Sequence, residues 1–97
     1  MDKDTILGQL EELARSLAIE VRYESLKREG AFYTGGLCRL KGAHVMIINS
    51  NATTQDKIEV LTRAVNRFDL SGVYLRPGLR EYLDRFPKQE DPSSEEE

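Results

Sequence analysis

The chain has 97 residues, of which 39% are apolar and 32% are charged, and this composition suits one globular domain with one modest core. No apolar run approaches the roughly 20 residues that a membrane-spanning helix needs, and the single cysteine, Cys38, excludes an internal disulfide. The first residues lack the basic and then apolar pattern of a secretory signal, so we expect a cytoplasmic protein.

The negative charge is concentrated at the C-terminal end. The formal net charge is −3, but residues 87–97 set Lys88 against five carboxylates, so this stretch alone carries −4 and residues 1–86 carry +1. A nearly neutral body produces no strong field for phosphate groups, and nucleic-acid binding is therefore not favoured. We expect one domain over residues 1–86, followed by a disordered acidic tail over residues 87–97.

Two elements are predicted in the first quarter of the chain. Helical spacing over residues 4–18 forms an apolar stripe, which consists of Ile6, Leu7, Leu10, Leu13, Ala14 and Leu17. Residues 19–24 then alternate strictly between apolar and polar side chains, which is typical of a half-buried strand.

A β-hairpin is predicted from residues 32–40 and 43–49, with Lys41 and Gly42 as its turn. A two-residue turn pairs Arg39 with His44, Cys38 with Val45, Leu37 with Met46 and Gly36 with Ile47. Residues 45–48 are apolar on both faces, so they are expected to form the central strand.

Two further helices are predicted after the hairpin. Thr53 or Thr54 caps a helix over residues 54–68, and Pro77 fits the first turn of a third helix that ends before Pro87. Residues 73–75 form a short strand or an extended link. The order of elements predicts an α+β fold, with a three-stranded, mainly antiparallel sheet and three helices packed mostly on one face.

No catalytic or metal-binding constellation is recognisable, so we expect no cofactor, and a role as an enzyme is not favoured. His44 has no Cys, Asp or Glu at metal-ligand spacing, and the predicted register directs Cys38 to the opposite face, which disfavours a Cys–His dyad. Gly35 and Gly36 weaken a strand by about 0.5–1 kcal/mol each. They either accommodate a bulge or permit close approach by a ligand, an anion or a partner backbone.

One stretch resembles a family of zinc peptidases that cleave phage-type repressors and stress regulators. The similar residues are a strand over 45–49 that ends in Ile-Asn and a helix over residues 57–66. The resemblance implies an N-terminal helix before the strand, and it places the metal-binding histidines at Thr62 and Asn66 and the catalytic glutamate at Arg63. None of these side chains can supply that chemistry, so the resemblance implies architecture without peptidase activity. The chain also resembles small uncharacterised bacterial proteins that share the Gly-Gly-Leu-Cys-Arg, Ile-Ile-Asn and Tyr-Leu-x-Pro order.

Three functional hypotheses remain open. The first is a non-enzymatic interaction module that binds a second copy or another protein through an apolar sheet face or edge. The predicted interface residues are Tyr33, Leu37, Met46 and Ile48. The second hypothesis is a small anion-binding or ligand-binding protein, or an enzyme, whose site consists of Gly35, Gly36, Arg39, Arg76 and Arg80. The third, nucleic-acid binding, requires the arginines to line one continuous face.

Overall fold

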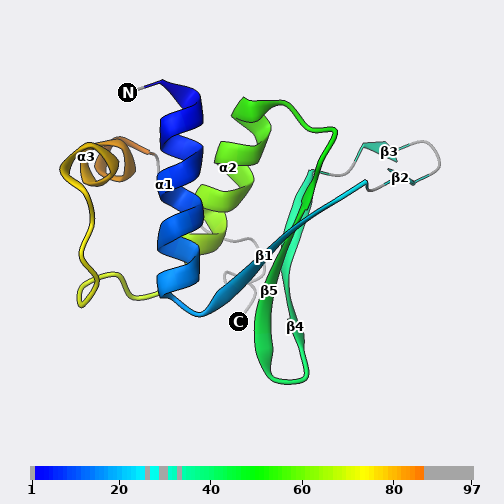
Figure 1. Cartoon of the computed structure of the whole chain (residues 1–97), viewed down its shortest axis with the longest axis horizontal. Coiled ribbons are helices and arrows are strands. Elements are labelled where there is room, and N and C mark those ends of the chain that lie inside the picture. Colours follow the sequence, from blue (N-terminus) through cyan, green and yellow to red (C-terminus); the bar gives the residue numbers. More distant parts are fainter. Residues whose placement is uncertain (1, 26, 29–30, 33, 87–97) are drawn as a thin grey trace, which may run out of the picture.

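The computed structural model describes residues 2–25, 27–28, 31–32 and 34–86, which form one small α+β unit. In chain order its elements are α1 (Lys3–Ser16), β1 (Ile19–Glu24), β2 (Lys27–Arg28), β3 (Ala31–Phe32), β4 (Gly35–Leu40), β5 (Ala43–Asn49), α2 (Thr54–Val65) and α3 (Pro77–Arg85). Figure 1 shows the helices gathered on one side of the sheet, so the predicted fold class is confirmed. The tail predicted over residues 87–97 lies outside the described residues.

The main sheet is mixed rather than mainly antiparallel. Its strand order is β1-β5-β4, with β5 in the centre as expected, antiparallel to β4 and parallel to β1. The chain reverses between β1 and β4 and reverses again at the hairpin turn. Two reversals return β5 to the direction of β1, so one of the two strand pairs is parallel and the expectation of a mainly antiparallel sheet is corrected.

The predicted hairpin register is confirmed. Arg39 lies opposite His44, Leu37 opposite Met46, and the remaining pairs follow in step. Lys41 and Gly42 have φ angles of 54° and 83°, and positive φ at both central residues is the condition for a type I′ turn. That turn has the twist of the strands it joins, so it fixes the register.

The start of each helix follows from a local signal. The Asp2 carboxylate accepts a hydrogen bond from the Thr5 amide at 2.8 Å, and the Thr53 hydroxyl accepts one from the Asp56 amide at 3.1 Å. Pro77 opens α3 at a position where no amide hydrogen is needed. The segment over residues 73–75 is a link rather than a strand.

A short antiparallel pair of strands, β2 and β3, lies between β1 and the hairpin, and β3 includes Phe32, where the first hairpin strand was expected to begin. As a result, β4 begins at Gly35 rather than at residue 32. Strands of two residues carry too few side chains to show a period, and the sequence pattern therefore gave no sign of them.

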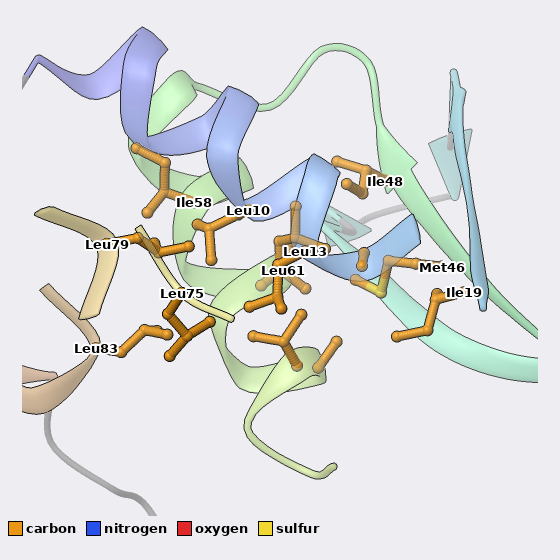
Figure 2. Packing of buried hydrophobic residues seen from close by; sticks show 14 residues of the cluster. Leu10, Leu13, Ile19, Met46, Ile48, Ile58, Leu61, Leu75, Leu79 and Leu83 are labelled. Atoms are coloured by element: carbon orange, nitrogen blue, oxygen red, sulfur yellow. The ribbon is translucent and has the colours of Figure 1, made fainter. Parts of the chain in front are cut away.

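The core lies between the sheet and the helices. α1 and α2 pack side by side against the sheet. α3 packs on the side of α1 that faces away from the sheet (Figure 1). Figure 2 shows the side chains that fill this space. Those with 2% exposure or less include Leu10, Ile19, Met46, Ile48, Ile58, Leu61 and Leu79. None of the described helices has the length and hydrophobicity needed to cross a bilayer.

Candidate functional site

The two faces of the sheet differ in what covers them. Met46 and Ile48 are fully buried in the core that the sheet forms with the helices (Figure 2), and Leu37 packs against the same core. The predicted interface is therefore wrong in its choice of face, because helices of the same chain cover these side chains. Both faces of the hairpin are apolar, so alternation alone could not identify the covered one. Tyr33, the fourth predicted interface residue, lies outside the described residues.

The opposite face, which we call the outer face, has no described helix over it (Figure 1). Alternate residues of the three strands form it: Glu20, Arg22 and Glu24 from β1, Ala43, Val45, Ile47 and the buried Asn49 from β5, and Gly36, Cys38 and Leu40 from β4. Its centre is enclosed, since Val45 is only 2% exposed between Glu20 and Cys38, whereas Leu40 at its margin is 46% exposed. The outer face is thus apolar over β4 and over β5 up to Ile47, and charged over β1.

The two edge strands differ in the same way. β1 carries Glu20, Arg22 and Glu24, and the Arg22 guanidinium donates to the Glu20 carboxylate at 2.8 Å, which raises the pKa of Arg22. β4 carries one charged residue, Arg39, and that side chain lies on the helix side with His44. Charged side chains protect a strand edge against pairing with another chain. Of the two edges, β4 is therefore the one with less protection.

The two adjacent glycines have different roles. Gly35 has a φ of +142°, and a Cβ atom there would overlap the carbonyl oxygen of Ile47, so the fold itself requires glycine. At Gly36 an added Cβ would meet nothing within 4 Å, because the position opens onto the outer face. The strand geometry requires glycine at position 35 only. Gly36, the cross-strand partner of Ile47, has no side chain although there is space for one.

The structure does not bring the predicted anion-binding residues together. Arg76 lies before α3 and donates to the Glu12 carboxylate on α1, with an Nε–Oε1 distance of 3.1 Å. This ion pair raises the pKa of Arg76 and lowers that of Glu12. Arg80 lies on α3, which is separated from β4 by α1 (Figure 1). The predicted site is therefore wrong as a single constellation, because Arg39 and the glycines belong to another part of the molecule.

Arg39 instead lines an open hollow at the end of the hairpin, with a volume of about 400 Å³. The other lining residues are Leu37, Cys38, His44, Arg67 and Phe68. The His44 and Phe68 rings meet edge to face, with their centroids 5.0 Å apart. The hairpin register already placed Arg39 opposite His44. The contribution of Arg67 and Phe68 could not be predicted, because it depends on how the turn after α2 packs on the sheet.

Comparison of the chain with protein families, with curated proteins and with solved structures finds no match.

The positions that correspond to the zinc ligands of the peptidase family do not fit a metal ion. Thr62 is fully buried, its hydroxyl donates to the Ile58 carbonyl at 2.7 Å, and it lies 3.3 Å from the Tyr82 hydroxyl. Arg63 is exposed and lies 4.0 Å from the Glu59 carboxylate. Within the described part of the chain, no group of three His, Cys, Asp or Glu side chains is placed to hold a metal ion. α2, which carries Thr62 and Arg63, contributes buried side chains to the core at this position.

Proposed function

We propose that the chain is a non-enzymatic protein-interaction module that forms a homodimer through the β4 edge and the adjoining apolar part of the outer face. The observation that carries this proposal is the one-sided arrangement of the helices, which leaves the outer face without a described helix over it. Leu40 is the exposed large apolar side chain of this face, and its transfer from water to a contact with a partner would be favourable. A cytoplasmic location belongs to the same proposal, and the single cysteine supports it.

A second copy is the partner that the edges favour. Two copies related by a two-fold axis present the same surface to each other, and their β4 strands meet antiparallel. β4 is an edge strand with no further described strand beside it, and it offers an exposed Leu40 and, at Gly36, room for close approach. Two β1 edges brought together would instead oppose the carboxylates of Glu20 and Glu24. The asymmetry between the edges therefore supports contact through β4.

Sedimentation velocity over a series of protein concentrations tests the proposal. We expect the wild-type chain to shift from monomer to dimer as its concentration rises. Leu40→Lys places a charge on the β4 edge and should weaken the dimer about tenfold or more. Since Leu40 is 46% exposed, the change should leave the stability of the monomer nearly unaltered.

Tyr74→Lys is the matched control, because it makes the same kind of change at a residue that is 80% exposed and lies in the link before α3. The dimerisation constant of this variant should equal that of the wild type. A wild-type chain that stays monomeric at every concentration would contradict the proposal, as would equal weakening by the two lysine substitutions.

A further inference from the structure

The hollow at the end of the hairpin combines cationic and apolar groups from three separate elements. Arg39 comes from β4 and His44 from β5, and these residues are cross-strand partners on the helix side of the sheet. Arg67 and Phe68 come from the turn after α2. The volume of about 400 Å³ lies within the range of roughly 300–1,000 Å³ that is usual for small-ligand clefts.

The charges of the lining favour an anion. The Arg39 guanidinium and the His44 imidazole line the hollow together with Arg67, which already has an interaction of its own, and no carboxylate lines it among the described residues. Arg39 makes no ion pair with another described residue, whereas Arg22, Arg63, Arg76 and Arg85 each lie beside a carboxylate. An arginine fork matches the geometry of a planar carboxylate or of a phosphate, because it can donate two parallel hydrogen bonds.

The apolar part of the lining limits the shape of the ligand. Phe68 meets His44 edge to face and so restricts the imidazole ring, and Leu37 adds an aliphatic surface next to Arg39. A bare inorganic ion would leave this apolar surface in contact with water. A ligand with a flat apolar group beside its charge would cover it.

Two features near the hollow oppose an anion, and neither places a carboxylate in its lining. The C-terminal end of α2 lies next to the hollow, and its dipole disfavours negative charge there. Asp69 follows Phe68, but its carboxylate accepts a hydrogen bond from the Ser71 amide at 3.0 Å, and this bond lowers its pKa. That carboxylate is engaged with its own turn and is not part of the lining.

We infer that the hollow formed by Arg39, His44, Arg67 and Phe68 binds a small organic anion, in which a carboxylate or phosphate is joined to a flat apolar group. Leu37, Arg39 and His44 line the hollow from the helix side of the sheet, whereas Cys38, which also lines it, belongs to the outer face. Binding does not require the proposed dimer, because one chain supplies all of these residues.

Titration of the full chain with phenyl phosphate, followed by amide NMR, tests this inference. We expect saturable shifts that centre on Arg39, His44 and Phe68. Arg39→Gln should weaken binding about tenfold, and Arg39→Lys, which keeps the charge and loses the fork, should weaken it less. Inorganic phosphate and phenol each supply half of the ligand, and each should bind about tenfold more weakly than phenyl phosphate.

Arg80→Gln is the matched control, because Arg80 is an exposed arginine on α3 without an ion pair to another described residue. Its affinity for phenyl phosphate should stay within about twofold of the wild-type value. Equal weakening by Arg39→Gln and Arg80→Gln would show a diffuse charge effect and overturn the inference. Shifts that centre elsewhere, or that never saturate, would overturn it as well. Amide spectra of each variant establish that it is folded before its affinity is compared.

Discussion

At Gly35 the backbone leaves room for hydrogen alone. Its φ of +142° and the nearby Ile47 carbonyl oxygen both exclude a Cβ atom, so we expect Gly35→Ala to lower the free energy of unfolding by about 1–3 kcal/mol. Urea denaturation measures this loss. Gly36→Ala is the control next to it, and it should cause no loss, since nothing lies within 4 Å of the added atom. Equal losses at the two glycines would contradict this account.

The sequence could not separate these two glycines. Adjacent glycines in a strand are compatible with a bulge or with close approach by a partner, and both readings were open. The backbone angle and the distance to the neighbouring strand decide between them, and neither is a property of the local sequence. Backbone geometry explains the glycine at position 35. Close approach by a partner remains a proposal for Gly36.

Tyr23 gives a prediction about pH. Its hydroxyl donates to the Glu11 carboxylate, and the ammonium of Lys57 lies 5.5 Å from the centre of its ring. Burial and then the Glu11 carboxylate raise the pKa of the phenol above its ordinary value of about 10. The folded state thus holds this proton more tightly than the unfolded chain. The stability that results is complete below pH 10 and decreases as the pH rises further.

Alkaline titration of tyrosinate absorbance checks this prediction for Tyr23. The Tyr23 phenol should titrate above the usual range in the wild-type chain, and Tyr23→Phe should remove this contribution from the curve. In Glu11→Gln the same phenol should titrate at lower pH, because the carboxylate that raises its pKa is gone. An unaltered curve in Tyr23→Phe would exclude the assignment.

Elements with local signals were predictable, and long-range pairings were not. The hairpin turn and the Thr53 cap depend on residues within a few positions of each other, and the structure confirms both. The parallel pairing of β1 with β5 joins segments about 25 residues apart, and alternation in a strand does not name its partner. The hollow beside Arg39 was missed for the same reason, because it forms only when the turn after α2 packs on the sheet.

The cap of α2 is testable at this scale. Thr53→Ala removes the acceptor for the Asp56 amide and should lower the free energy of unfolding by about 1 kcal/mol. Thr53→Ser keeps the hydroxyl and should retain most of the stability. Urea denaturation of the two variants measures the difference between them. If Thr53→Ala were as stable as Thr53→Ser, the hydrogen bond would make no net contribution to the free energy of unfolding.

The arrangement of the whole molecule depends on which face of the sheet the helices cover. The fold class was predictable because it follows from the order and number of elements. The covered face was not, because residues 45–48 are apolar on both sides and either set could have formed the core. The apolar side chains of α1 and α2 pack on Met46 and Ile48, and this contact determines which face is covered. We therefore propose the outer face, rather than the face with Met46 and Ile48, as the interface.

Gly36 connects this arrangement to the proposed dimer. Gly36→Val adds a β-branched side chain over open space, so the isolated monomer should keep or gain stability, by at most about 1 kcal/mol. The same side chain would separate two β4 strands that approach each other closely, and the dimer should weaken about tenfold or more. The wild-type melting temperature should therefore rise with protein concentration, whereas that of the variant should stay constant.

Gly8→Ala is the control for Gly36→Val, since Gly8 is exposed on α1 and also has nothing within 4 Å of an added Cβ atom. It should raise stability by up to about 1 kcal/mol through helix propensity and leave the concentration dependence of the melting temperature intact. If Gly36→Val kept the wild-type dependence, close approach at β4 would not be part of the contact between copies. A dependence lost in both variants would mean that the substitutions act through the fold rather than through the outer face.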